Sequence, residues 1–275
     1  MASHPQHGEG IAFIGGGNMA SAVIGGLVAG GHDPAAIVVV EPFEAQRARL
    51  RADFGVTATA GAVASLARAG LVVWAVKPQV FKQAAATCRE RVASALQLSV
   101  MAGIRSSAIA AATGTERVVR AMPNTPALIG QGIAGLYARA GASADDRGWV
   151  ERVLAPTGRT LWVAREVDLD AVTALSGSGP AYVFFLVEAM MQAAAEMGLG
   201  AEQGRVLALA TLAGASELAL RSGEPPSLLR ERVTSKGGTT HAALTVLEAA
   251  GVKQALIDAI RAAQQRASEL GDEFG

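Results

Sequence analysis

The stretch Ile11-Ala12-Phe13-Ile14-Gly15-Gly16-Gly17-Asn18-Met19-Ala20 decides the fold class of this chain. Four apolar residues typical of a buried strand run directly into glycines, and the residues after Ala20 carry the apolar spacing of a helix. Gly15, Gly17 and Ala20 match the pattern G-x-G-x-x-G/A, in which small residues let backbone N–H groups and a helix N-terminus approach a phosphate. The alternative is a glycine-rich turn that only links a strand to a helix, so the motif alone is a weak signal.

Strand and helix patterns alternate through the first 163 residues. The apolar runs that predict strands, beyond the first, are 36–40, 56–59, 71–76, 96–101, 117–122, 132–137 and 160–163. Helical spacing separates most of them, and the connections are short. This alternation predicts a Rossmann-like, doubly wound parallel sheet of the α/β class, and it turns the glycine motif into a strong indication of dinucleotide binding.

Polar residues follow several of these strands, at the edge where an open parallel sheet binds its ligands. Glu41 ends the second strand, where a carboxylate accepts hydrogen bonds from an adenosine ribose and repels a 2′-phosphate. This favours NADH, although Arg47 and Arg49 could serve a phosphorylated cofactor. The alternative for Glu41 is an ordinary solvated residue at a helix start. Lys77-Pro78 follows the fourth strand and is expected beside the glycine loop.

Composition and charge narrow the classes of partner. The formal net charge is zero, so neither a nucleic acid nor an anionic membrane is expected as a partner. Cys88 is the only cysteine, which excludes an intrachain disulfide. The polar segment 1–10 lacks an apolar signal core and is expected to be a disordered tail of a cytoplasmic protein. We expect no metal site. We also expect no membrane span, since the apolar run 181–195 is interrupted by Glu188 and Gln192.

The strand signal ends near Arg165. The segments with helical spacing after it are 168–175, 180–197, 201–221, 226–232, 239–250 and 252–270. We therefore predict a dinucleotide-binding domain at 11–163 and an all-helical domain at 164–275. Apolar helices with so few aromatic residues cannot cover themselves in a segment this short, so we expect a second subunit to pack against them.

A dinucleotide-binding sheet joined to a helical domain suggests hydride transfer. Carbonyl-reducing enzymes commonly place a lysine or histidine against the reacting oxygen. Here no lysine lies between Lys82 and Lys236, and the histidines are confined to positions 4, 7, 32 and 241. A protonated imine carries its own positive charge and accepts a hydride without a strong protein acid. The missing residues therefore favour a substrate with a C=N bond.

A second concentration of polar residues lies at Val233–His241, between two predicted helices. Its backbone N–H groups, hydroxyls and Lys236 suit the carboxylate of a small anionic molecule. The alternative is that Thr239 or Thr240 only caps the following helix, which would explain one of the hydroxyls. Ser176-Gly177-Ser178-Gly179-Pro180 is a similar turn of small residues, for which close packing is the simpler explanation.

Several motifs follow one another along the chain in a characteristic order. They are Phe13-Ile14-Gly15-Gly16-Gly17-Asn18-Met19, Val76-Lys77-Pro78-Gln79, Arg120-Ala121-Met122-Pro123-Asn124-Thr125-Pro126, Leu175-Ser176-Gly177-Ser178-Gly179-Pro180-Ala181-Tyr182 and Val233-Thr234-Ser235-Lys236-Gly237-Gly238-Thr239-Thr240. In order and spacing they resemble the motifs of the pyrroline-5-carboxylate reductases of proline synthesis, over residues 11–270. The resemblance implies reduction of the cyclic imine 1-pyrroline-5-carboxylate to L-proline, with NADPH or NADH as cofactor. It also implies an interlocked homodimer through the helical domain, with higher assembly common.

The resemblance also implies roles for individual residues. The loop Gly15–Met19 would hold the pyrophosphate. The nicotinamide half would be lined by Val76, Lys77, Pro78, Ala102, Gly103 and Asn124. The contacts to the substrate carboxylate and ring nitrogen would come from Ser235, Gly238, Thr239 and Thr240, with Thr240 as the proton donor. Thr173 would be a further contact near the nicotinamide. The chain departs from the family pattern at Lys236, where proline is more usual, which leaves the loop backbone less constrained and adds a charge.

Two other functions stay open on the residues alone. One is a β-hydroxyacid-type dehydrogenase of similar two-domain plan, against which the missing lysine of the helical half argues. The other is a non-catalytic NAD(P)-binding sensor or scaffold, which has no need of a hydroxyl-rich carboxylate site.

Overall fold

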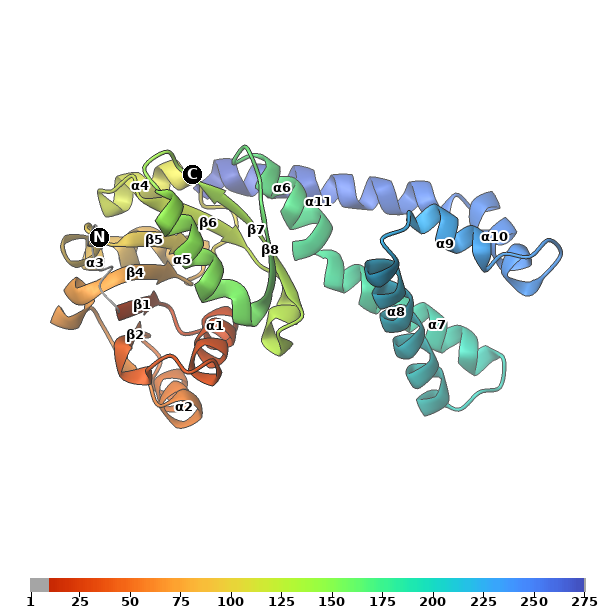
Figure 1. Cartoon of the computed structure of the whole chain (residues 1–275), viewed down its shortest axis with the longest axis horizontal. Coiled ribbons are helices and arrows are strands. Elements are labelled where there is room, and N and C mark those ends of the chain that lie inside the picture. Colours follow the sequence, from red (N-terminus) through yellow and green to blue (C-terminus); the bar gives the residue numbers. More distant parts are fainter. Residues whose placement is uncertain (1–9, 275) are drawn as a thin grey trace, which may run out of the picture. The chain divides into compact units, whose positions relative to one another are not determined.

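The computed structural model describes residues 10–274 (Figure 1). Residues 1–9 of the predicted tail lie outside the described part, and Gly10 begins the first strand. The strands are β1 Gly10–Ile14, β2 Ile37–Val40, β3 Thr57–Thr59, β4 Ala69–Trp74, β5 Leu96–Ser99, β6 Val118–Met122, β7 Gly132–Ala138 and β8 Gly158–Trp162. The helices are α1 Asn18–Ala29, α2 Glu44–Phe54, α3 Phe81–Val92, α4 Ser106–Thr113, α5 Ala144–Leu154, α6 Asp168–Val172, α7 Gly179–Glu196, α8 Ala201–Ser222, α9 Pro226–Arg232, α10 Thr239–Ala249 and α11 Val252–Phe274.

The strands of the described residues form one sheet in the order β3-β2-β1-β4-β5-β6-β7-β8. The order reverses beside β1, as in a doubly wound fold, which confirms the predicted fold class. One pair differs from the prediction, because β7 runs antiparallel to β6. Residues 123–131, which include the 3₁₀ turn Thr125–Ile129, join these two strands, and a parallel crossover needs a longer connection.

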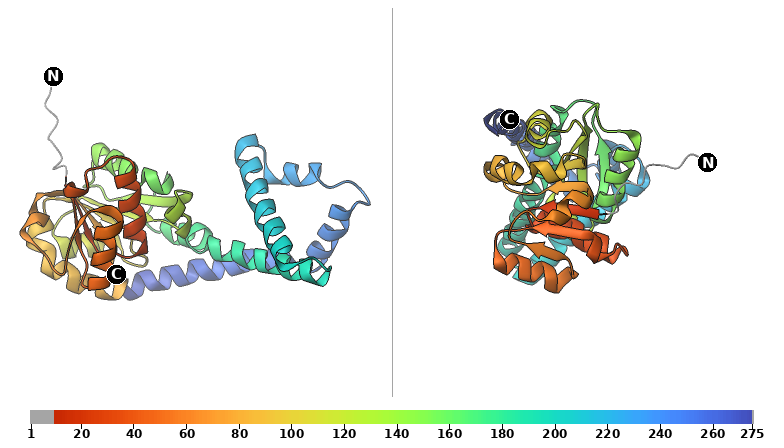
Figure 2. Two further views of the ribbon diagram at one scale, coloured as in Figure 1. Left: turned by 90° about the horizontal axis from the view of Figure 1, so that it is seen from below. Right: turned by 90° about the vertical axis from the view of Figure 1, so that its left-hand side faces the viewer.

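Helices cover both faces of the sheet because the strands are apolar on both faces (Figure 2). On one face, Phe13 lies in a buried cluster with residues of α1, α2 and α5. On the other face, the neighbouring Ile14 lies in a cluster with residues of α3 and α4. Packing on both faces therefore holds the first strand in place, and with it the start of the glycine loop that follows.

Contacts divide the chain into two compact units. One runs to Ser178 and takes in the end of α11 from Ala263, and the other is Gly179–Ala262. The boundary predicted at residue 164 follows the last strand, whereas the first unit also keeps α6. Beyond that strand the described residues form helices and no strand, as predicted from their spacing.

The stretch Asp168–Glu196 corrects one expectation. It is 29 residues long, has a mean hydropathy of 1.2, and is long and apolar enough to cross a membrane by length and composition alone. The sequence did not indicate it, because only the run 181–195, with Glu188 and Gln192 inside it, was considered as a span. Large apolar side chains here are exposed in the single chain, for example Phe184 at 59% and Phe185 at 70%. An apolar surface of this kind is typical of a helix that packs against a partner.

Candidate functional site

The glycine loop forms an open cradle at the carboxyl end of β1. Gly15 has a φ of +97°, and a Cβ there would lie 2.6 Å from the carbonyl oxygen of Ala75. Gly17 is the N-cap of α1 and makes no side-chain cap, and a Cβ at this position would meet nothing within 4 Å. The N–H groups of Asn18 and Met19, in the first turn of α1, have no hydrogen-bond partner among the described residues, and this arrangement suits a pyrophosphate.

Glu41 is turned into this loop. Its Oε2 accepts the N–H of Gly16 at 2.9 Å and its Oε1 accepts the N–H of Phe43 at 3.0 Å. The residue is 6% exposed, so the alternative of an ordinary solvated glutamate is wrong. Gln46 donates its side-chain N–H to the carbonyl of Gly16 and holds the loop from the other side. The sequence did not indicate this role of Gln46, because the residue belongs to none of the motifs.

The arginines that follow Glu41 are already paired. Arg47 donates to the carbonyls of Glu41 and Pro42, at 2.8 and 2.7 Å, and to the carboxylate of Glu44. Arg49 is 3.3 Å from Asp53. The side chain of Arg47 is 13% exposed and is held by these contacts, whereas that of Arg49 is 66% exposed and its pair with Asp53 lies on the surface. The expected preference for NADH stays a prediction.

The segment after β4 lies against the glycine loop. A Cβ at Gly15 would lie 3.0 Å from Val76 Cγ1, so Val76 lies beside the glycine loop. The predicted place of Lys77 and Pro78 beside the cofactor stays a prediction. Lys77 is exposed and forms no ion pair with any described residue. Ala102 is also exposed, and Gly103, with a φ of +72°, is close to the end of α11, where a Cβ would lie 3.2 Å from the carbonyl of Leu270.

Asn124 connects three segments at the end of β6. Its Nδ2 donates to the carbonyl of Ser176 at 3.2 Å, and its Oδ1 accepts the N–H of Ile133 at 3.0 Å. Ser176 belongs to a π turn, Thr173–Gly177, which continues α6. The hydroxyl of Thr173 donates to the carbonyl of Leu169 at 2.7 Å, so its lone pairs are left to accept a hydrogen bond from a ligand.

A charged network beside β6 ties α4 and the segment before α6 to the sheet. Glu166 accepts hydrogen bonds from the N–H and hydroxyl of Ser106, each at 2.6 Å, and from Arg120 Nη1 at 2.8 Å. Burial raises the pKa of Glu166, but the hydrogen bonds from Ser106 and Arg120 outweigh it and leave the pKa below its usual value. Burial lowers the pKa of Arg120 despite this partner. The network positions β6, which leads directly to Asn124.

The predicted substrate loop forms a turn that leads into a helix. The carbonyl of Ser235 accepts the N–H of Gly238 at 3.0 Å, and Gly237 has a φ of +76°. This geometry is a type II turn with Lys236 at its first corner, the position that favours proline. Gly238 is the N-cap of α10 and makes no side-chain cap. The alternative that Thr239 or Thr240 caps the helix is therefore wrong.

The hydroxyls of this loop are available to a ligand. Those of Ser235, Thr239 and Thr240 have no hydrogen-bond partner in the part of the chain that the structure describes. They stand at a helix N-terminus whose first N–H groups are also uncapped. Hydroxyls and N–H groups in this arrangement suit a carboxylate.

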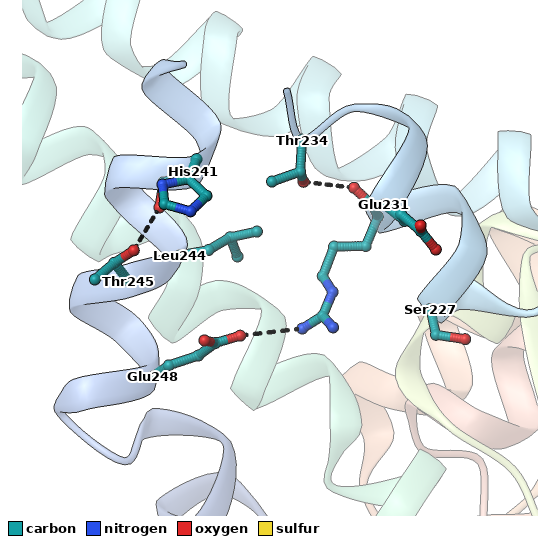
Figure 3. Close-up of a pocket in the computed structure, with 8 residues that line it drawn as sticks. Ser227, Glu231, Thr234, His241, Leu244, Thr245 and Glu248 are labelled. Carbon is teal, nitrogen blue, oxygen red and sulfur yellow. Dashed lines mark hydrogen bonds and ion pairs between the residues drawn. The ribbon is translucent and has the colours of Figure 1, made fainter. Parts of the chain in front are cut away.

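A pocket of about 350 Å³ lies beside this loop, between α9 and α10 (Figure 3). Thr234 and His241, which flank the loop, contribute to its wall. Arg230 and Glu248 face each other across it at 3.7 Å, and both are exposed. An exposed pair at this distance contributes little to stability. The sequence did not indicate this pocket. Within residues 10–274 no cluster of three or more His, Cys, Asp or Glu could hold a metal ion.

Comparisons with known proteins cover both parts of the chain. A family model described as pyrroline-5-carboxylate reductase dimerisation matches residues 166–270, and one described as NADP oxidoreductase, coenzyme F420-dependent, matches residues 10–103. The pyrroline-5-carboxylate reductase of Pseudomonas aeruginosa is 43% identical over 271 residues, which cover 96% of this chain and 98% of the relative.

Solved structures agree with these matches. The pyrroline-5-carboxylate reductase of Coxiella burnetii superposes with a TM-score of 0.89 at 36% identity, over 94% of this chain and 97% of that one. The pyrroline carboxylate reductase of Plasmodium falciparum, solved with NADP bound, gives a TM-score of 0.84 at 26% identity, over 95% and 98% of the two chains.

Proposed function

This chain belongs to the pyrroline-5-carboxylate reductase family, and from that premise we infer that it reduces 1-pyrroline-5-carboxylate to L-proline with NAD(P)H. The reaction is the last step of proline biosynthesis and converts a C=N bond into a C–N bond. Neither the β-hydroxyacid dehydrogenase nor the non-catalytic sensor is favoured by the relatives.

The described residues fit a dinucleotide. When bound, NAD(P)H supplies the hydride. The N–H groups of the loop Gly15–Met19 would hold the pyrophosphate, because the loop has no side chain in the way and its helix end is uncapped. Val76, Lys77 and Pro78 would line the nicotinamide half beside Gly15.

The substrate contacts belong to the loop that leads into α10 and to the first two residues of that helix. The open N–H groups of α10 and the hydroxyls of Ser235 and Thr239 would bind the carboxylate. Gly238 leaves room for the Ser235 hydroxyl, because a Cβ at Gly238 would lie 2.6 Å from Ser235 Oγ. Thr240 Oγ1 would donate its proton to the ring nitrogen. The hydroxyl of Thr173 would accept a hydrogen bond near the nicotinamide.

The assembly follows from the helical half. The chain forms a homodimer through the segment matched by the dimerisation model, residues 166–270. That segment contains most of the apolar stretch 168–196, so we assign this surface to the partner subunit and not to a membrane. We further propose that dimers can associate into a higher oligomer and that the enzyme is cytoplasmic, with no nucleic acid or membrane partner.

One observation supports the assignment of the substrate site: uncapped N–H groups and unpartnered hydroxyls coincide at the start of α10. The test measures oxidation of NADH and of NADPH with pyrroline-5-carboxylate for the wild type, Thr240→Ala and Thr245→Ala. Thr245 is the matched control, because its hydroxyl only donates to the carbonyl of His241, at 2.9 Å. We expect turnover in the wild type and the control, and a loss of about 10²-fold in Thr240→Ala. No turnover with either cofactor would refute the function, and unchanged turnover in Thr240→Ala would refute only the role of Thr240.

A further inference from the structure

The π turn between α6 and α7 has a cause in the sequence. The N–H of Ser178 donates to the carbonyl of Thr173 at 2.8 Å, a five-residue step in place of the four-residue step of an α-helix. Pro180 stands four residues after Ser176 and has no N–H to donate to its carbonyl. The α-helical pattern therefore fails at this point, and single π turns inside helices are frequent at functional sites.

Asn124 supplies a donor where Pro180 cannot. Its Nδ2 donates to the Ser176 carbonyl, and its Oδ1 accepts the N–H of Ile133, the second residue of β7. One end of the side chain must donate and the other must accept, and an amide does both. A single residue thus ties the π turn to the ends of β6 and β7.

Two glycines let the turn approach the sheet. A Cβ at Gly177 would lie 2.8 Å from Met122 Cε, at the end of β6. A Cβ at Gly135 in β7 would lie 2.6 Å from Cγ1 of Val172, which is the residue before the turn. Close packing against β6 and β7 fixes the position of the π turn, and the hydrogen bond from Asn124 fixes the direction of its Ser176 carbonyl.

We propose that Asn124 is a positioning residue of the imine reduction, which acts through the Ser176 carbonyl to hold the π turn and with it the hydroxyl of Thr173. The proposal rests on the reductase function given above. It replaces the expected role of Asn124 as a lining residue of the cofactor, because both ends of its amide bind backbone groups of the protein.

Two variants test this role. Asn124→Ala removes both hydrogen bonds, and we expect kcat to fall by about 10-fold to 10²-fold, since small misplacements of this kind have effects of that size. The dissociation constant of NADPH, measured by fluorescence titration, should stay within about twofold, because the glycine loop is untouched. If Asn124 contacted the cofactor instead, its substitution would weaken NADPH binding and leave kcat unchanged.

The second variant, Asn124→Asp, adds a pH readout. A protonated aspartic acid can donate to the Ser176 carbonyl and accept from Ile133, whereas the ionised form can only accept. The ratio of its kcat to that of the wild type should therefore rise as the pH falls. The same ratio should be independent of pH for Asn124→Ala. Gln131→Glu makes the same amide-to-acid change on an exposed residue of the same β6–β7 connection, and its ratio should stay near one at every pH.

The outcomes separate the two proposals. If the wild type is active and the Asn124→Asp ratio does not change with pH, or if Asn124→Ala keeps its kcat, the positioning role is refuted and the reductase function stands. A weaker NADPH affinity with unchanged kcat would also refute it in favour of a cofactor contact. A wild type without turnover refutes both. If Asn124→Ala does not fold, the pH dependence of Asn124→Asp decides alone.

Discussion

Glu41→Gln is the substitution whose effect follows most directly from the geometry of the glycine loop. Both carboxylate oxygens of Glu41 accept backbone N–H groups, from Gly16 at 2.9 Å and from Phe43 at 3.0 Å, and the residue is 6% exposed. A glutamine has one carbonyl oxygen, so it can serve only one of the two donors. Its NH₂ group would then face the other N–H, donor against donor.

The magnitude combines two effects. A hydrogen bond to a charged acceptor contributes about 1.5–3 kcal/mol, and a buried donor left without an acceptor costs about 1–3 kcal/mol. Allowing for relaxation of the loop, we expect Glu41→Gln to lower the free energy of unfolding by about 3 kcal/mol. The isosteric substitution should therefore be strongly destabilising, and NADH should bind more weakly because Gly16 lies in the pyrophosphate loop.

Urea unfolding followed by circular dichroism measures the stability, at one protomer concentration because the protein is a dimer. Glu44→Gln is the matched control, since Glu44 is exposed and pairs only with Arg47 and Arg51 on the surface of α2. We expect the control to unfold at nearly the wild-type urea concentration. If Glu41→Gln unfolds there too and binds NADH with unchanged affinity, the assigned role of Glu41 in the loop is wrong.

Four further outcomes are expected. Gly15→Ala should abolish NADH binding in a fluorescence titration, because its Cβ would meet Ala75, whereas Gly31→Ala has a similar φ and open space and should bind normally. Glu41→Ala should raise kcat/KM with NADPH relative to NADH, and an unchanged ratio would mean that the acid does not contact the ribose. Folding lowers the pKa of Glu166, so its carboxylate stabilises the fold fully above the ordinary pKa, and this stabilisation is lost as the pH falls through the pKa of the folded state. The difference in free energy of unfolding between the wild type and Glu166→Gln, measured in urea, should therefore shrink in acid. A difference that stays constant with pH would contradict this expectation. The protein should sediment as a dimer or larger, and a stable monomer would contradict the packing of the helical half.

The sequence was sufficient for the parts of the fold that depend on local patterns. The β1 strand, its glycines and α1 follow from apolar spacing and from residues without side chains. The strand ends after β4 and β6 follow in the same way, because parallel strands must return to the same edge of the sheet. The hydroxyls around the start of α10 stand out in the sequence because they are dense over a few residues, and their contact with the substrate stays a prediction.

Other features depend on where side chains point, which periodicity does not show. The inward turn of Glu41 is set by the N–H of Gly16, and the antiparallel β7 by the short link after Asn124. The π turn was missed because its cause is split between Pro180 and an amide more than fifty residues earlier in the chain. The exposed apolar side chains of 168–196 are explained only when a partner subunit packs against them.

In the reaction that we infer, the hydride goes to the carbon of a C=N bond. The most direct measurement supplies the enzyme with pyrroline-5-carboxylate and NADH that carries deuterium at the transferable position of the nicotinamide, and analyses the product by mass spectrometry. We expect L-proline with one deuterium on the ring carbon that was the imine carbon, and oxidised cofactor in equal amount. Proline without deuterium, or no proline while a hydroxyacid is oxidised by NAD⁺ at a substantial rate, would contradict the claim.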